Sequence, residues 1–164
     1  AESMGQLTHS RHVGILATEG TIRSNSYDME IGKLFPDIKV TGQPCPLWAA
    51  IVEANEADSP GADYFVKKLM RRDPLIDTII LGCTHYPLLM NSIVRNVPDG
   101  VRVMPQGTYV ANSLNSYLQR HPDIEANITR GGQCHYLTTE SEDRFAESAQ
   151  IFLHEKINVT HVEL

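Results

Sequence analysis

The sequence predicts a three-layer α/β/α protein, in which helices cover both faces of a mainly parallel sheet. Two observations lead to this prediction. Short apolar runs typical of strands alternate along the chain with stretches whose apolar residues recur at helical spacing. The run at residues 79–81 contains only apolar side chains, which is typical of a parallel strand that is buried on both faces.

The expected elements alternate between strands and helices. Four strands are expected in the first part of the chain, at residues 13–17, 38–42, 79–81 and 101–104. Helices are expected at residues 24–35, 47–55, 62–70, 87–97 and 109–120. Residues 121–130 are polar and show no strong pattern. The chain then continues with an alternating strand at 133–139, a helix from Ser141 through Leu153 and an edge strand at 158–164.

The composition is that of an ordinary globular protein, with 164 residues, 41% hydrophobic residues and a net charge of −6. This charge argues against nucleic acid as a partner, because phosphate binding requires a basic surface. We expect no membrane contact and no signal peptide, and three cysteines without framework spacing indicate the cytoplasm. The chain starts at Ala1 rather than at an initiator methionine, so we expect a piece of a longer protein.

A thiol, a hydroxyl and an imidazole follow the most apolar strand. Cys83, Thr84 and His85 lie between Gly82, which permits a sharp turn, and Pro87, which suits the start of a helix. Open α/β sheets bind their ligands at this end of the strands. If the segment stays extended, the Cys83 and His85 side chains point the same way, which indicates a reactive thiol. The alternative is that Cys83 is a small buried hydrophobe.

Three further residues are candidates for the same site. Thr18 and Thr21 follow the first strand and are able to hold a carboxylate at the start of the next helix. The alternative for both threonines is simple capping and turn formation. Glu53 lies near the apolar face of the helix at 47–55, where it is either an ordinary edge charge or the partner that orients an imidazole.

Metal binding and several other chemistries are not expected. The spacing of the cysteines and neighbouring histidines fits no zinc pattern, and phosphate-binding glycine loops and a serine-hydrolase elbow are absent. The residues considered for zinc are Cys45, Cys83, His85, Cys134 and His135. Cys45 lies between two prolines and is expected to be structural, so thiol chemistry at Cys83 remains.

Three segments, taken together, resemble glutamate racemase, the cofactor-independent isomerase that supplies D-glutamate for peptidoglycan. Residues 81–89 read LGCTHYPLL, which is similar to the family's catalytic cysteine motif. Residues 17–24, ATEGTIRS, resemble its substrate loop, and residues 45–53, CPLWAAIVE, resemble its Cys-Pro-Leu…Val-Glu helix. Related aspartate racemases share the scheme, so the reaction class is better defined than the amino acid.

The resemblance implies a role for each candidate. Cys83 corresponds to one of two cysteines that exchange the Cα proton, His85 to its neighbouring imidazole and Glu53 to the carboxylate that assists the histidine. The resemblance also implies three residues that bind the substrate, Thr18, Thr21 and Thr84. It implies no cofactor and glutamate as the small-molecule substrate. No metal is expected from the spacing, and pairing into a homodimer stays open.

Two motifs of the family are missing from this chain. Its Asp-Ser-Gly-x-Gly-Gly loop and the Cys-Asn-Thr loop with the second cysteine do not occur, and Pro105-Gln106-Gly107 replaces an Asp-Ser-Gly type turn. By the resemblance, residues 1–104 form the second α/β domain, and residues 105–164 return to complete the first. The chain is therefore expected to be the carboxyl-terminal portion of a racemase, with half an active site and little activity alone.

Two other functions stay open. The first is an amino-acid-binding or assembly module that keeps the fold and has lost catalysis, since a fold does not fix a function. The second is a hydrolase that uses Cys83 as nucleophile and His85 as base, although the sequence contains no signature of an oxyanion hole.

Overall fold

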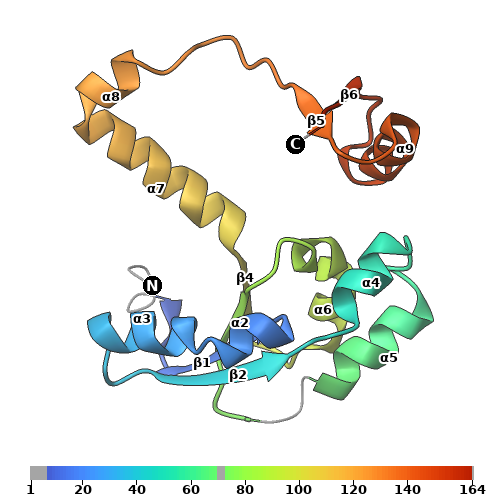
Figure 1. The fold of residues 1–164 in the computed structure, drawn as a ribbon. Coiled ribbons are helices and arrows are strands. Elements are labelled where there is room, and N and C mark those ends of the chain that lie inside the picture. Colours follow the sequence, from blue (N-terminus) through green and yellow to red (C-terminus); the bar gives the residue numbers. More distant parts are fainter. Residues whose placement is uncertain (1–6, 70–72, 164) are drawn as a thin grey trace. The chain divides into compact units, whose positions relative to one another are not determined.

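A computed structural model describes residues 7–69 and 73–163 of the chain. It confirms an α/β protein with a parallel sheet and divides into two compact units, Ala1–Asn115 and Ser116–Leu164 (Figure 1). Each unit is described by itself. Among the described residues, no helix combines the length and the apolar character needed to cross a membrane.

The first unit is built on a four-stranded parallel sheet in the order β2-β1-β3-β4. Its strands are β1 (His12–Ala17), β2 (Lys39–Pro44), β3 (Thr78–Leu81) and β4 (Arg102–Pro105). Ile15 of β1 lies opposite Gly42 of β2 and Ile80 of β3. All four predicted strands are present. The second is longer than predicted, because the stretch Gln43–Pro44, which suggested a turn, still pairs with β1.

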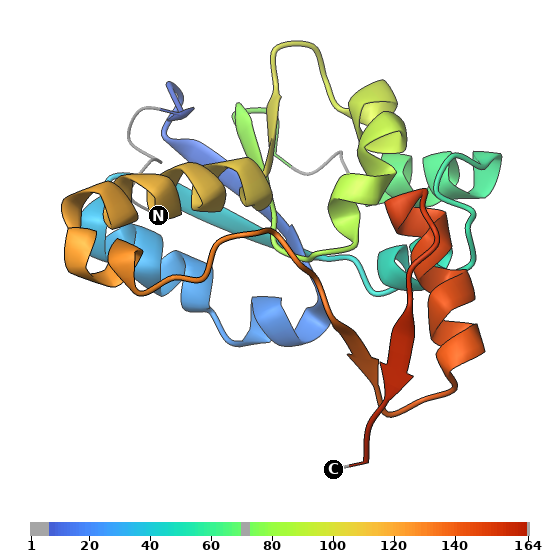
Figure 2. The same ribbon diagram turned by 90° about the horizontal axis from the view of Figure 1, so that it is seen from above.

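One face of the sheet carries the main core. Val13, Ile15 and Ala17 of β1 alternate with residues that point to the opposite face, as the strand period requires. They pack with Ile31 of α3 (Ser26–Leu34), and the short helix α2 (Glu19–Arg23) lies beside α3 on this side (Figure 2). Complete burial of a side chain such as Ile15 stabilises the fold by about 1.5–3 kcal/mol.

The predicted helix at residues 24–35 starts at Ser26, and a separate short helix, α2, precedes it. Thr18 caps α2, and Asn25 has a left-handed backbone (φ 53°) that separates α2 from α3. Asparagine adopts this conformation more readily than most residues because its short side chain can bond locally. The threonine-rich turn of the sequence is therefore a short helix of its own.

Four further elements form a second buried cluster. These are α4 (Trp48–Glu53), α5 (Pro60–Leu69), the 3₁₀ helix η1 (Tyr86–Leu89) and α6 (Met90–Asn96). The rings of Trp48 and Tyr86 meet edge to face with centroids 5.1 Å apart. The predicted helix at 87–97 consists of two elements, because its first turn is the 3₁₀ helix η1 and α6 follows. The predicted helix at 62–70 begins earlier, at Pro60, and its last predicted residue lies outside the described residues.

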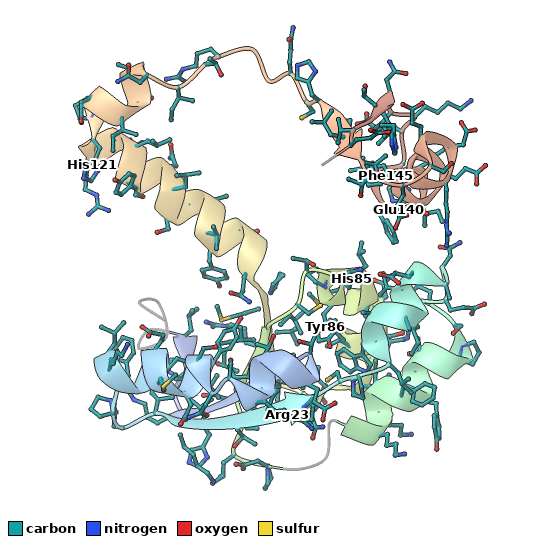
Figure 3. All side chains as sticks on the ribbon, viewed as in Figure 1. Arg23, His85, Tyr86, His121, Glu140 and Phe145 are labelled. Carbon is teal, nitrogen blue, oxygen red and sulfur yellow. The ribbon has the colours of Figure 1, made fainter. Side chains whose placement is uncertain are left out.

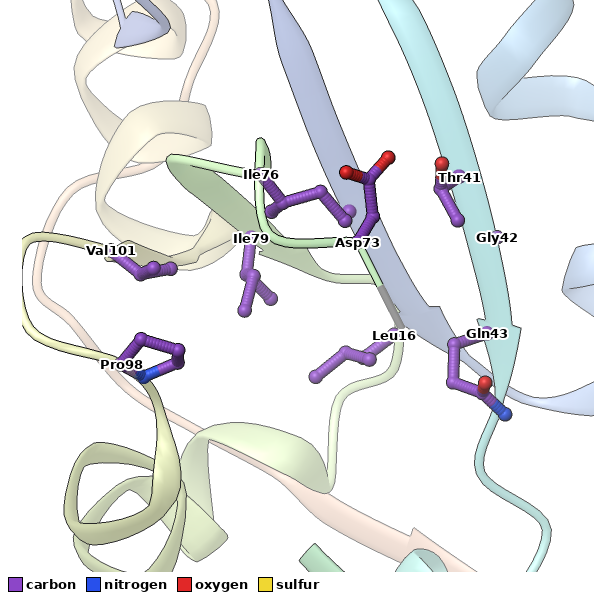
Figure 4. Close-up of a pocket in the computed structure, with 10 residues that line it drawn as sticks. Leu16, Thr41, Gly42, Gln43, Asp73, Ile76, Ile79, Pro98 and Val101 are labelled. Atoms are coloured by element: carbon purple, nitrogen blue, oxygen red, sulfur yellow. The ribbon is translucent and has the colours of Figure 1, made fainter. Parts of the chain in front are cut away.

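A pocket of about 120 Å³ opens on the face of the sheet opposite the main core (Figure 4). Leu16 and Ile79 lie on its floor, and Asp73 and Gln43 are among its polar lining residues. None of the sequence-predicted site residues lines it. The pocket is thus a separate feature from the candidate site.

The second unit contains a two-stranded parallel sheet. β5 (Tyr136–Thr138) pairs with β6 (Val159–His161), and α9 (Glu142–Leu153) connects them. Helix α7 (Gln106–Arg120) runs from the first unit into the second, and α8 (Pro122–Ala126) follows. Helix α8 lies in the stretch where no element was predicted. Strand β5 is shorter than the strand predicted at 133–139, so Cys134 and His135 lie before it.

Candidate active site

The carboxyl ends of the four parallel strands lie at one edge of the sheet. Thr18 follows β1, Cys45 follows β2, Gly82 follows β3 and Gln106 follows β4. Backbone hydrogen bonds connect neighbouring ends, from Cys45 N to Ala17 O at 2.9 Å and from Gly82 N to Leu16 O at 2.8 Å. The sequence-predicted candidates Thr18 and Cys83 therefore emerge from adjacent strands.

No side chain fits at Gly82, the residue that precedes the turn. A Cβ atom at this position would lie 2.9 Å from Cβ of Ala17, closer than side chains tolerate, so only glycine fits here. The following residues are not extended, as the sequence argument assumed. They form a turn in which Tyr86 N donates to Cys83 O at 3.3 Å, and this turn leads directly into η1.

The turn brings a thiol, an imidazole and a carboxylate together. Cys83 Sγ lies 3.8 Å from His85 Nδ1, and His85 Nε2 lies 3.1 Å from Glu53 Oε1 at the end of α4. Figure 3 shows His85 and Tyr86 on the segment that follows β3. We call Cys83, His85 and Glu53 the triad. Glu53 and His85 are 32 positions apart in the chain, so the fold brings them together.

The contacts of His85 define its tautomer. A carboxylate oxygen can only accept, so Nε2 carries the hydrogen toward Glu53, and in the neutral ring Nδ1 is then the acceptor that faces the thiol. This arrangement lets the imidazole take or return a proton at Cys83 Sγ. The His85 side chain is 33% exposed and that of Glu53 is 65% exposed, so the pair orients the ring and adds little to stability.

The candidate threonines are placed differently. Thr18 Oγ1 and Thr21 Oγ1 lie 2.9 Å apart, and Thr18 caps α2 by accepting from Thr21 N at 3.4 Å. The capping alternative is thus present in the structure, at the end of β1 next to the Gly82 turn. Thr84 is exposed and directly follows Cys83.

The other two cysteines lie outside the triad. Cys45 is 1% exposed, as expected for a structural residue, and burial raises the pKa of its thiol to about 12. Cys134 is exposed in the second unit. Among the residues for which the structure gives positions, no three His, Cys, Asp or Glu side chains are grouped as metal ligands would be.

Sequence reasoning missed one polar residue at the same edge. Gln106 Nε2 lies 2.6 Å from Tyr27 Oη and 2.8 Å from the carbonyl oxygen of Leu81, the last residue of β3. The signal that was available is positional, because Gln106 follows β4 directly, as Thr18 follows β1.

Fold and site together define the class of this protein, an α/β protein with a thiol, an imidazole and a carboxylate at the carboxyl edge of a parallel sheet. No protein-family model matches the chain. In sequence, the chain is 34% identical to the glutamate racemase of Lactiplantibacillus plantarum, over 96% of the chain and 59% of the relative. It is 31% identical to that of a Thermoanaerobacter strain, over 100% of the chain and 62% of the relative.

Solved structures give the same result. The glutamate racemase isoform RacE1 of Bacillus anthracis matches with a TM-score of 0.88 and 32% identity, over 99% of this chain and 61% of the other. The enzyme of Francisella tularensis, solved with D-glutamate, matches with a TM-score of 0.78 and 28% identity, over 94% of this chain and 57% of the other. The chain is homologous to glutamate racemases and spans about three fifths of their length.

Proposed function

We propose that this chain contributes one half of the active site of a glutamate racemase, which interconverts L- and D-glutamate without a cofactor. The observation that carries the proposal is the triad, in which His85 lies within reach of both the Cys83 thiol and the Glu53 carboxylate. The homology to glutamate racemases supports glutamate as the substrate. Aspartate is the alternative substrate.

Racemisation removes the Cα proton from one face of the amino acid and returns a proton to the other face. In this proposal Cys83 acts on one face of Cα and a second cysteine acts on the opposite face. In each direction one of them takes the Cα proton as a thiolate, and the other gives a proton as a thiol. His85 holds the proton that Cys83 releases on becoming a thiolate, and Glu53 keeps the ring in the tautomer that accepts it. Thr84 binds the substrate through its backbone amide or its hydroxyl, and Thr18 and Thr21 hold a carboxylate of the substrate.

The second thiol would come from another part of the protein. One thiol reaches one face of Cα only, and the remaining cysteines of this chain are the buried Cys45 and the exposed Cys134 of the second unit. We propose that the second thiol belongs to the part of the protein that corresponds to the segment of the relatives outside the match with this chain. On its own the chain would therefore show little or no racemase activity.

Residues 105–164 are proposed to complete the first α/β domain of the racemase, and residues 1–104 are proposed to form its second. A parallel pair such as β5 and β6 normally belongs to a larger sheet that is covered on both faces. Here each strand has three residues, and Leu137 of β5 is 58% exposed. Further strands from the segment that the chain does not cover would bury this side chain.

We further propose that the protein acts in the cytoplasm, where D-glutamate enters peptidoglycan synthesis, and that two copies of it pair.

Deuterium incorporation tests the proposal. The 164-residue chain and the product of its complete reading frame are each incubated with L-glutamate in deuterated water, and Cα deuterium and D-glutamate are followed by NMR. We expect both signals from the complete product only. The substitution Cys83→Ser should reduce them by about a hundredfold or more, since it removes one acid/base group. Cys134→Ser, at an exposed position, is the matched control and should change neither.

Two results would contradict the proposal. The first is a complete product that acts on neither glutamate nor aspartate, and the second is full activity after Cys83→Ser. Deuterium exchange without inversion by the 164-residue chain would show that Cys83 works alone on one face.

A hydrolase remains the second candidate, because a Cys–His–carboxylate triad also suits nucleophilic catalysis. A covalent acyl group on Cys83 after incubation with an activated ester, detected by mass spectrometry together with turnover, would favour this function.

A further inference from the structure

The side-chain amide of Gln106 has a defined orientation at the edge of the sheet. Its Nε2 lies 2.8 Å from the carbonyl oxygen of Leu81, and a carbonyl oxygen can only accept. The atom that faces Leu81 must therefore be the nitrogen. The second hydrogen of the same nitrogen points to Tyr27 Oη at 2.6 Å, so the phenol oxygen accepts from Gln106.

The tyrosine that Gln106 holds packs against the glycine before Cys83. A Cβ atom added to Gly82 would lie 3.2 Å from Tyr27 Oη, 3.3 Å from Tyr27 Cε2 and 2.9 Å from Cβ of Ala17. Gly82 is therefore enclosed between the end of β1 and the ring of Tyr27. This close approach fixes where the backbone can turn after β3.

The peptide between Leu81 and Gly82 is thus held on both sides. Its carbonyl oxygen accepts from Gln106, and its N–H donates to Leu16 O at 2.8 Å. Cys83 is the next residue, and its Sγ lies 3.8 Å from His85 Nδ1. The backbone position of Cys83 depends on the peptide that precedes it.

We propose that Gln106 and Tyr27 are positioning residues that keep Cys83 in contact with His85. They act through the Leu81–Gly82 peptide and need not touch the substrate. The position of Gln106 at the start of α7 also couples the start of that helix to the reactive thiol. The inference rests on the proposed function only where it concerns the reaction of Cys83 with a substrate. The contacts of Gln106 and Tyr27 do not depend on that function.

A double-mutant cycle on thiol reactivity tests this inference without any racemase assay. In a Cys134→Ser background, the alkylation rate of Cys83 by iodoacetamide is measured by peptide mass spectrometry at neutral pH. We expect His85→Asn to lower this rate by about threefold or more, because the imidazole no longer takes the thiol proton. The same substitution is then made in a Gln106→Glu background, where the carboxylate cannot donate to Leu81 O. There the effect of His85→Asn on the alkylation rate should be less than half of its effect in the wild-type background. Such coupling is expected between residues that share a network.

Two further variants keep the test decisive. Tyr27→Phe removes only the phenol oxygen and should also weaken the effect of His85→Asn, so it replaces Gln106→Glu if that protein does not fold. Gln119→Glu, an exposed position on the same helix, is the matched control and should leave the effect unchanged. Thermal unfolding verifies that each variant is folded.

The inference is overturned if His85→Asn has the same effect in the wild-type, Gln106→Glu and Tyr27→Phe backgrounds. It is also overturned if His85→Asn does not change Cys83 alkylation at all. Because no substrate is present, a positive cycle combined with a negative deuterium experiment would refute the proposed function and leave this inference intact.

Discussion

Tyr86 donates its hydroxyl hydrogen to the carbonyl oxygen of Cys45 at 2.9 Å, and both residues are at most 1% exposed. Burial, and to a lesser extent the neighbouring thiols, raise the pKa of Tyr86, which keeps the phenol protonated as a donor. The bond connects the end of β2 with η1. It therefore holds the turn that carries Cys83 and His85 beside α4, which carries Glu53.

Tyr86→Phe should destabilise the protein by about 1–2 kcal/mol, because the buried carbonyl of Cys45 loses a donor. The loss is limited, since Trp48 N also donates to this oxygen at 3.3 Å. Urea denaturation measures the change. Tyr64→Phe, at a side chain that is 62% exposed, is the matched control and should change stability by a few tenths of a kcal/mol. Equal effects of the two substitutions would contradict the assigned role of the hydrogen bond.

Gly82→Ala should destabilise the protein and disturb the triad. The new Cβ would overlap Cβ of Ala17 at 2.9 Å, and neither backbone can move without breaking the pairing of β1 and β3. We expect about 1–3 kcal/mol of lost stability, the range for overpacked positions. Gly32→Ala inside α3 is the comparison, because none of the residues that the structure describes comes within 4 Å of its added Cβ. It should stabilise by up to about 1 kcal/mol, as alanine is the better helix former.

The three thiols should separate by reactivity. Cys83 is partly exposed and Cys134 is exposed, whereas Cys45 is buried. Brief treatment of the native protein with iodoacetamide at neutral pH should therefore add two groups, and treatment in urea should add three. Mass spectrometry of the digested protein gives both counts. Modification of Cys45 in the native protein would show that its burial, and with it the assigned structural role, is wrong.

Much of the sheet was predictable because β1 and β3, its two central strands, are rich in apolar residues and are followed by glycine or threonine. Residues 79–81 lie within β3, and the ligand edge follows from parallel topology. Local breaks were not predictable from apolar spacing, because a single left-handed residue, Asn25, separates α2 from α3 without changing the pattern. Helix α8 was missed because a single apolar residue other than alanine, Ile124, lies between Pro122 and Ala126.

The site was predictable in part for a similar reason. Cys83 and His85 lie two positions apart, so local geometry alone suggested their contact, although a turn and not a strand produces it. Gln106 was missed because its partners are distant, with 79 positions to Tyr27 and 25 to Leu81. Contacts of this kind depend on the order of the strands in the sheet, and apolar spacing along the sequence does not predict that order.

Asp77 fastens the start of the described chain to β3. Its carboxylate accepts from Thr8 Oγ1 and from the backbone N–H groups of His9 and Ser10, each at 2.7 Å. Partial burial alone would raise the pKa of Asp77, but the bonds from Ser10, Thr8 and His9 outweigh it and lower the pKa well below its usual value. The ionised form is therefore the one that the folded state prefers.

Asp77→Asn should destabilise the protein by about 1–3 kcal/mol at pH 7, because an amide offers one acceptor oxygen where three donors converge. The pKa of Asp77 is lower in the folded state, so its contribution is fully present above the ordinary value and is lost as the pH falls below about 4. The difference in unfolding free energy between the wild-type protein and the variant should shrink over that range. Urea denaturation at several pH values measures it. Asp99→Asn, at an exposed turn, is the control and should show no such trend. A difference that stays constant down to pH 3 would mean that the charge of Asp77 does not provide the attachment.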